Sequence, residues 1–267
     1  MMTPPSAPRA ACVIVTRAQD EATRWVQALQ ARGVQARALP LITIEALHDV
    51  QPLQHLWQDR IHYSALMFVS ANAVRHFMQA LPDAAAPQVP AHLRAWATGP
   101  GTQAALLAQG WPPEQIDVPD AQSQVWDSEG LWVRVEATVQ PGQKVLIVRG
   151  ADDSGQMAGR DWLARQLTAA GVQVLQCLAY VRRCPSWGEH ERSLALQYTR
   201  QSCWWLFSSS QAAEHLQQLC PDLPVQDGKA MATHPRIAQR LQTLGWGRVE
   251  QTAPGLASLV ESIESLA

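Results

Sequence analysis

Four short turns of this sequence carry residue types that can bind an anion. They read VSANA at 69–73, ATGPGT at 97–102, SSSQA at 208–212 and ATHPR at 232–236. Each follows an apolar run and precedes a segment with helical spacing. Ligands of open α/β sheets bind beyond the carboxyl ends of the strands, where helix N-termini present N–H groups and a partial positive charge. Plain helix capping explains any single turn, but four equivalent turns favour a ligand with several carboxylates or phosphates.

Two arginines stand at equivalent places after apolar runs. Arg17 ends ACVIVTR, and Arg149 ends KVLIVR. A guanidinium group there can form charge-assisted hydrogen bonds with ligand carboxylates, or it can pair with a neighbouring carboxylate on the protein surface. The sequence leaves both alternatives open for each arginine.

The sequence lacks the motifs of several other kinds of site. There is no G-x-x-x-x-G-K-[ST] phosphate-binding loop, and the glycines at 99–101 lack the third glycine of a dinucleotide fingerprint. The serines at 208–210 have no G-x-S-x-G context for a nucleophile. The histidines show no metal-ligand spacing. We expect helix-surface positions for His48, His55, His62, His76 and His92. The sequence therefore predicts neither a metal nor a nucleotide cofactor.

The elements that position these turns alternate in the pattern of parallel sheets covered by helices on both faces. ACVIVTR, for example, is typical of a buried strand, and EATRWVQALQAR after it places apolar residues on one helical stripe that ends at Gly33. Similar series recur in both halves of the chain, with five short strands expected in each half. The fold class is therefore α/β.

The two halves match piece by piece, which indicates a duplication. Thr98 matches Thr233, and Gly110-Trp111 matches Gly245-Trp246. The separation between matched residues stays between about 132 and 139 residues. That period is too long for a solenoid repeat and suits a duplicated α/β domain.

The composition limits the partners and the location of the protein. With 267 residues, 47% hydrophobic residues and a formal charge of −2, it fits two folded domains that have no global attraction to nucleic acid or membranes. Five cysteines without C-x-x-C spacing favour a reducing compartment. The apolar run before Thr16 is too short for a signal peptide or a membrane span. We therefore expect a cytoplasmic protein.

Eight segments carry a resemblance to a known family. They are VTR at 15–17, FVSANAV at 68–74, ATGPGTQAAL at 97–106, DSEGL at 127–131, VLIVRG at 145–150, GVQVLQCLAYVRR at 171–183, LFSSSQAAEHL at 206–216 and a final P-x-x-x-x-L-V pattern. In order, spacing and duplication they resemble the uroporphyrinogen-III synthase family of the tetrapyrrole pathway. The resemblance covers nearly the whole chain.

The resemblance implies two flavodoxin-like parallel-sheet domains linked by a two-stranded β hinge. In that family the domains exchange their first elements. One domain would then comprise residues 1–40 and 182–267, and the other would comprise residues 45–177. The chain would cross between them at 39–46 and 176–183, two β-rich stretches able to pair as the hinge. Such a hinge would let the domains open and close around a cleft ringed by the four turns.

The activity implied is that of a lyase. It closes the linear tetrapyrrole hydroxymethylbilane to uroporphyrinogen III, with loss of water and inversion of the last pyrrole ring. The substrate carries many carboxylates, which suits the anion-binding turns. Because it also cyclises by itself to the wrong isomer, the enzyme mainly has to orient it. No cofactor is implied, and we expect a monomer that contacts hydroxymethylbilane synthase transiently.

The resemblance also implies which residues act. Tyr180, in the second crossing, is the expected donor of a hydrogen bond to the leaving hydroxyl, and packing at the domain junction is the alternative role for a strand tyrosine. The expected carboxylate holders, several through backbone N–H groups, are Arg17, Ser70, Ala71, Asn72, Thr98, Gly99, Thr102, Arg149, Ser208, Ser209, Ser210 and Thr233.

At two places the sequence departs from the family pattern, and both affect the expected roles of substrate-binding residues. His234 stands where the family's turn has a small residue, so the turn of Thr233 can bind differently. The segment ADDSGQMAGRDW at 151–162 is longer than the family's loop, which leaves the roles of Arg149 and Arg160 open.

Two other classes of protein remain alternatives. A non-catalytic two-domain clamshell that binds a small anionic ligand would share the cleft and the hinge, and it would leave hydroxymethylbilane to close spontaneously. A flavodoxin-like redox protein would be yellow with bound flavin, which a visible spectrum detects.

Overall fold

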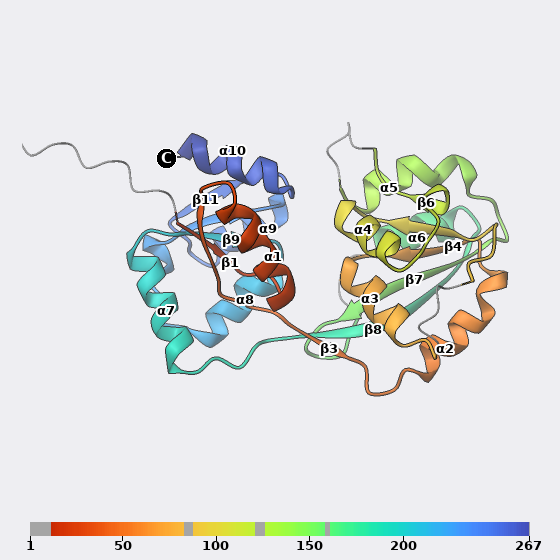
Figure 1. Cartoon of the computed structure of the whole chain (residues 1–267), viewed down its shortest axis with the longest axis horizontal. Helices are drawn as coiled ribbons and strands as arrows, with labels where there is room; N and C mark the ends of the chain where they lie inside the picture. The colour runs from red at the N-terminus through yellow and green to blue at the C-terminus, as the bar shows by residue number, and fades with distance from the viewer. Residues whose placement is uncertain (1–11, 83–87, 121–125, 158–160, 267) are drawn as a thin grey trace, which may run out of the picture. The chain divides into compact units, whose positions relative to one another are not determined.

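The computed structural model describes residues 12–82, 88–120, 126–157 and 161–266. The chain divides into two compact units (Figure 1). The first unit combines Met1–Thr43 with Cys184–Ala267, and the second unit is Ile44–Arg183. The chain therefore passes from the first unit to the second and back again.

The first unit is built on a parallel sheet of five strands in the order β11-β10-β9-β1-β2. Along the chain of this unit the order reads 2-1-3-4-5, which is the flavodoxin-like order. The sheet joins strands that are far apart in sequence, since Val13 pairs with Trp204. The strands are β1 (Cys12–Val15), β2 (Gln35–Ala38), β9 (Trp204–Phe207), β10 (Lys229–Ala232) and β11 (Arg248–Gln251).

Helices cover both faces of this sheet. The unit's helices are α1 (Gln19–Gln30), α7 (Glu189–Arg200), α8 (Ser210–Leu219), α9 (Pro235–Thr243) and α10 (Leu256–Leu266), with a short 3-10 turn η5 (Val225–Asp227). On one face, Val13, Val15 and Leu206 belong to a buried cluster with residues of α1 and α10, which contact each other (Figure 1). Ile14 and Trp205 alternate with these residues and point to the other face, where α8 and α9 contact β9 and β10.

The second unit contains a sheet of six strands in the order β3-β8-β7-β4-β5-β6. The pairs from β8 to β6 are parallel. If β7 is counted as the first strand, β8-β7-β4-β5-β6 has the same 2-1-3-4-5 order, so this sheet is a circular permutation of the first. The strands are β3 (Thr43–Ala46), β4 (Ala65–Phe68), β5 (Arg94–Ala97), β6 (Ile116–Asp117), β7 (Lys144–Ala151) and β8 (Gln173–Arg183).

Two buried clusters lie on opposite faces of this second sheet. The unit's helices are α2 (Gln51–Gln58), α3 (Ala71–Gln79), α4 (Pro100–Ala108), α5 (Ser128–Val135) and α6 (Trp162–Ala169), with 3-10 turns η1 (Asp59–His62), η2 (Pro113–Gln115) and η4 (Glu136–Thr138). Under α2, α3 and α4, Phe68 contacts Phe77 and Trp111 edge to face. Under α5 and α6, Met67 and Trp96 face the second cluster.

Strand β8 is eleven residues long. It pairs with β7 as far as Val181, and a register shift between Arg149 and Gly150 places Gly150 opposite Tyr180. On its other side β8 neighbours β3. The two stretches in which the chain changes units are therefore neighbouring strands of one sheet, and the second stretch also pairs with β7.

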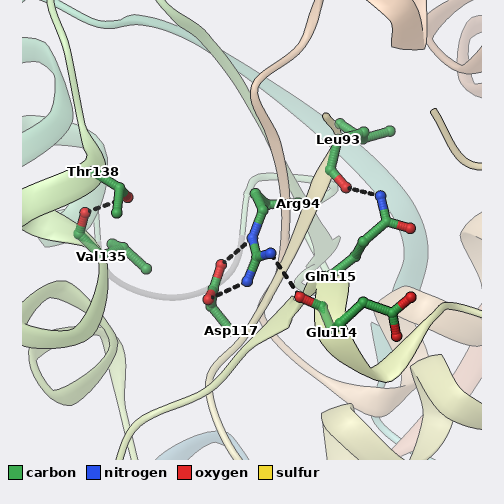
Figure 2. Close-up of polar contacts among 7 residues, drawn as sticks. All are labelled: Leu93, Arg94, Glu114, Gln115, Asp117, Val135 and Thr138. Carbon is green, nitrogen blue, oxygen red and sulfur yellow. Dashed lines mark hydrogen bonds and ion pairs between the residues drawn. The ribbon is translucent and has the colours of Figure 1, made fainter. Parts of the chain in front are cut away.

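Arg94 fastens the short edge strand β6 to β5 (Figure 2). Its guanidinium donates to both carboxylate oxygens of Asp117, at 2.8 and 2.6 Å, and to the carbonyl of Glu114 at 2.7 Å. The Nε2 of Gln115 donates to the carbonyl of Leu93 at 3.0 Å. Because β6 has only two residues, its backbone ladder to β5 is short. The side-chain hydrogen bonds of Arg94 and Gln115 therefore help to hold β6 at the edge of the sheet. Arg94 begins β5, so this fastening is at the amino end of the sheet.

In the part of the chain that the structure describes, no helix is long and apolar enough to cross a membrane. The same residues contain no group of three or more His, Cys, Asp and Glu side chains that could hold a metal ion. All five cysteines are free thiols.

Candidate active site

Ser70 and Thr98 bring two of the predicted turns together at the carboxyl edge of the second sheet. Ser70 is the N-cap of α3, and its Oγ accepts a hydrogen bond from the N–H of Ala73 at 3.1 Å. Thr98 follows β5 and donates its hydroxyl to the carbonyl of Val69 at 3.2 Å. The turns that start α3 and α4 are therefore neighbours.

The other predicted residues of these two turns differ in what they offer a ligand. Ala71 begins α3, and Asn72 accepts a hydrogen bond from Arg75 at 2.6 Å. Gly99 is the N-cap of α4 in an extended conformation. Thr102 is buried, and its N–H donates to the carbonyl of Gly99 at 3.1 Å. Thr102 therefore offers the least to a ligand.

Tyr180 lies beside Ser70. Its side chain is buried, with 4% exposed, and its hydroxyl lies 3.1 Å from the Oγ of Ser70, where either oxygen can donate. Since the same Oγ accepts from the N–H of Ala73, one hydroxyl connects the phenol to the N-terminus of α3. A helix N-terminus stabilises negative charge nearby, so this position suits an oxygen on which charge develops.

Gly150 makes room for the ring of Tyr180. The two residues are opposite each other on β7 and β8. A Cβ at position 150 would lie 2.5 Å from Cζ and 2.6 Å from Cε2 of Tyr180, far inside the contact distance. Only glycine lets the strand approach the ring this closely.

His76 lies against the ring of Tyr180. The two rings are stacked, with centroids 5.6 Å apart and planes 28° apart. Burial, and then the neighbouring charge of Arg75, lower the pKa of His76 below its ordinary value. The imidazole is therefore neutral at neutral pH. The prediction that His76 lies on a helix surface is wrong, because tertiary packing places it partly buried against β8.

Arg149 is buried at the end of β7, with 3% exposed. Its Nη1 donates to the carboxylate of Asp161 at 2.8 Å. Of the two alternatives, the structure shows pairing with a protein carboxylate, although the guanidinium is in the interior and not on the surface. Asp161 directly precedes α6, so the pair fixes the start of that helix. Arg160 lies outside the described residues.

Arg17 occupies the equivalent place in the first unit. It pairs with Glu21 in the first turn of α1, and its guanidinium lies 4.2 Å from the ring centroid of Trp25. The side chain is 14% exposed. The ion pair and the cation–π contact together fix the guanidinium at the carboxyl end of β1.

The three serines after β9 occupy different positions at the start of α8. Ser209 is the N-cap, and Ser210 is the first helical residue. The Oγ of Ser208 is buried and makes no hydrogen bond within the described ranges. Ser208 therefore keeps hydrogen-bonding capacity beside a helix N-terminus.

Backbone and hydroxyl contacts join the turns of the first unit along one edge. The hydroxyl of Thr16 donates to the carbonyl of Leu206 at 2.7 Å. The N–H of Thr233 donates to the carbonyl of Phe207 at 3.1 Å. In the same turn His234 is the N-cap of α9, and its Nδ1 accepts from the N–H of Arg236 at 3.1 Å. Histidine thus caps this helix in place of the expected small residue.

The predicted residues thus form two groups, one at the carboxyl edge of each sheet. The family model described as uroporphyrinogen-III synthase HemD matches residues 23–261, which include both groups except Arg17. This chain belongs to that family. Its function is that of a uroporphyrinogen-III synthase, a cyclising lyase of heme biosynthesis with hydroxymethylbilane as its small-molecule substrate.

Solved structures of uroporphyrinogen-III synthases are similar in fold. The enzyme from Helicobacter pylori is 15% identical, with a TM-score of 0.60, and the match covers 96% of this chain and 100% of that chain. A mutant enzyme from Thermus thermophilus is 16% identical, with a TM-score of 0.56, and the match covers 96% of this chain and 98% of that chain. The prediction of a two-domain α/β fold is confirmed.

The candidate site also contains residues that the motifs in the sequence do not single out. Gly150 belongs to the VLIVRG segment, and a glycine at a strand end is a signal of close approach. His76 follows Ser70 by two steps of three residues through Ala73, and residues three apart are neighbours on a helix surface. Nothing along the sequence indicates that Tyr180 lies against these residues.

Proposed function

We propose that the two groups of turns hold the carboxylates of hydroxymethylbilane, and that Tyr180 assists loss of its terminal hydroxyl during closure to uroporphyrinogen III. One observation supports the proposed catalytic role of Tyr180. The Tyr180 hydroxyl lies 3.1 Å from Ser70 Oγ, which caps the N-terminus of α3. The reaction follows from membership of the family, and the geometry of this chain supports the proposed roles of its residues.

In this proposal the phenol of Tyr180 donates a hydrogen bond to the leaving oxygen. The C–O bond of the hydroxymethyl group breaks with its electron pair on oxygen, the phenol passes its proton to the departing hydroxide, and water leaves. The pyrrole carbon that forms the new C–C bond then loses one proton, which restores the phenol, so the net reaction releases only water. Ser70 can donate to the phenol oxygen in turn, so developing negative charge is shared with the N-terminus of α3. Because the substrate also closes without an enzyme, orientation contributes more than a strong acid would.

Helix N-termini are the proposed holders of the carboxylates. In the second unit these are the first turns of α3 and α4, with Ser70, Ala71, Asn72, Thr98, Gly99 and Thr102. In the first unit they are the first turns of α8 and α9, with Ser208, Ser209, Ser210 and Thr233. The unused hydrogen-bonding capacity of Ser208 supports a ligand contact there. A polyacidic substrate matches these partial positive charges.

The two arginines are proposed to act differently. Arg17 is partly exposed and is held flat on Trp25, so a substrate carboxylate can replace or join Glu21 as its partner. Arg149 is almost wholly buried, which supports a role in holding Asp161 and the start of α6.

We further propose that the crossings at 39–46 and 176–183 act as a hinge between the domains 1–40 plus 182–267 and 45–177, in a cytoplasmic monomer that contacts hydroxymethylbilane synthase transiently. The place of β3 and β8 as neighbours supports paired crossings. Small-angle scattering with and without uroporphyrinogen III tests the hinge. A smaller radius of gyration with ligand is expected, and an unchanged one would contradict a hinge that closes on the ligand.

The direct test of function incubates the purified protein with freshly made hydroxymethylbilane and separates the uroporphyrin isomers after oxidation. Isomer III is expected as the main product, faster than product forms in buffer alone. If only isomer I appears, as in spontaneous closure, the proposal fails and the non-catalytic clamshell takes its place.

A further inference from the structure

We propose that His76 is a positioning residue that holds the ring of Tyr180 in place, so that the phenol keeps its alignment with Ser70. The inference rests on the proposed role of Tyr180 and adds a residue that acts through it. His76 would contact neither the substrate nor the breaking bond.

Three residues from two elements hold the ring of Tyr180. Its hydroxyl meets Ser70, the cap of α3, at 3.1 Å. Gly150 of β7 lies so close that a Cβ there would be 2.5 Å from the ring. The imidazole of His76 stacks on the ring, with centroids 5.6 Å apart. Ser70 fixes the end of the phenol and the other two contacts limit its swing, so the three together define one orientation.

The spacing along α3 explains how one helix makes two of these contacts. Ser70, Ala73 and His76 follow each other at intervals of three residues, so each is the neighbour of the next along the helix surface. Ala73 is fully buried in the same cluster as Tyr180. Helix α3 contacts β8, the strand that carries Tyr180. The residue that bonds the hydroxyl and the residue that covers the ring therefore move as one rigid element.

The environment of His76 suits packing better than proton transfer. Its own helix places Arg75 beside it, and Arg75 is bonded to Asn72. Burial and this cation lower the pKa of His76, so the ring that faces Tyr180 at neutral pH is uncharged. A flat neutral ring stacks on a phenol without adding a charge next to its hydroxyl. Removing it would leave a space into which the phenol could turn.

The test is a double-mutant cycle on isomer III formation. His76→Ala removes the ring and His76→Phe keeps a flat one, and each is made with Tyr180 and with Tyr180→Phe. With Tyr180 present, His76→Ala is expected to lower kcat roughly tenfold with little change in KM, because a small misplacement of a reacting group slows the reaction. His76→Phe is expected to recover most of that loss. In the Tyr180→Phe background, His76→Ala is expected to have no further effect.

Two kinetic results would overturn the inference. One is an unchanged kcat in His76→Ala. The other is an equal loss with Tyr180 and with Tyr180→Phe, which would mean that His76 acts by another route. His55→Ala, on the exposed side of α2 in the same unit, is the matched control for loss of a histidine ring, and thermal unfolding confirms that every variant folds.

A crystal structure of His76→Ala separates failure of this inference from failure of the proposed function. The inference expects the Tyr180 hydroxyl to leave hydrogen-bonding distance of Ser70. An unmoved ring would refute the positioning role while the role of Tyr180 stands. Full kcat in Tyr180→Phe would instead refute the role of Tyr180, and the inference that rests on it would fall with it.

Discussion

The carboxyl edges of the two sheets are built alike but hold different side chains. In each unit a serine occupies the N-cap position of the helix after the central strand, Ser70 before α3 and Ser209 before α8, and the side chain of Ser70 accepts a capping hydrogen bond. In the second unit the long strand β8 brings Tyr180 to that cap. Its equivalent in the first unit, β2, ends at Ala38 and brings no tyrosine. Both sheets therefore present helix N-termini at this edge, but only the longer β8 adds a tyrosine.

This difference suggests a division of labour between the two edges. The second unit presents a phenol that can assist departure of a leaving group. The first unit presents Arg17 and the Ser208 hydroxyl, which can bind carboxylates but cannot take the place of a phenol. Changes at the second edge are therefore expected to lower kcat, and changes at the first edge are expected to raise KM.

Among changes to the residues around Tyr180, Gly150→Ala is expected to give the largest effect on this contrast. The new Cβ meets ring atoms of Tyr180 that cannot move freely, so the phenol is displaced. We expect kcat to fall by at least roughly tenfold, and the free energy of unfolding to fall by about 1–3 kcal/mol. Denaturant unfolding and steady-state kinetics measure both. Gly255→Ala, whose Cβ would meet nothing closer than 3.8 Å, is the control, and equal behaviour of the two variants would refute the close-approach argument.

Alanine at the two serines compares the edges directly. Ser70→Ala removes a helix cap and the partner of Tyr180, so it should cost about 1 kcal/mol of stability and lower kcat. Ser208→Ala removes a hydroxyl that makes no hydrogen bond in the described parts of the chain, so stability should hold while KM rises. Unfolding curves and kinetics of both variants test the contrast. If Ser208→Ala lowered kcat as much as Ser70→Ala, the two edges would not have different roles, and the contrast would be refuted.

Arg94→Ala tests whether a change can lower the stability of the second unit without lowering kcat. Loss of the bonds to Asp117 and Glu114 should lower the free energy of unfolding by about 1–2 kcal/mol. The kcat should stay unchanged, since Arg94 is at the amino end of β5. Arg248→Ala, which breaks a more exposed pair with Glu250, is the control with a smaller expected loss of stability. A large fall in kcat for Arg94→Ala would show that this end of the sheet also shapes the site.

The smallest expected effect is a pH dependence of stability that comes from His76. Its pKa is lowered in the folded state below the ordinary 6.5, so the unfolded chain binds the proton first as the pH falls. The stability contribution is fully present above pH 6.5 and is lost as the pH falls through the folded pKa. His76→Phe should therefore lose less stability than the native protein between about pH 7.5 and about pH 5.5. Equal losses in urea unfolding at the two pH values would contradict the lowered pKa.

The two-unit fold could be predicted from the sequence because its signals are local. Alternating strands, polar turns and helical stripes repeat along both halves, and the duplication sets the scale. Helix α7 is an exception, since EHERSLALQYTR is too polar to show a clear apolar stripe. Its start is marked by Glu191, which accepts a hydrogen bond from the N–H of Gly188 at 2.8 Å. Capping of this kind is weaker than periodicity as a sequence signal.

The candidate site could be predicted only in part. Cap residues identify the turns, but the surroundings of Tyr180 depend on a register shift between β7 and β8 that places Gly150 opposite it. The stacking of His76 and the burial of Arg149 depend likewise on which elements meet in three dimensions. One sequence shows which side of a helix is apolar, but it does not show which residue lies across from that side.

The most direct measurement compares Tyr180→Phe with Tyr198→Phe, which removes the same hydroxyl from another buried tyrosine, on α7 of the first unit. The rate and the isomer composition of the product are measured from fresh hydroxymethylbilane. We expect Tyr180→Phe to lower kcat on the order of 100-fold without loss of folding, so that isomer I from spontaneous closure accumulates, while Tyr198→Phe forms isomer III normally. Formation of isomer III at the native rate by Tyr180→Phe would contradict the account.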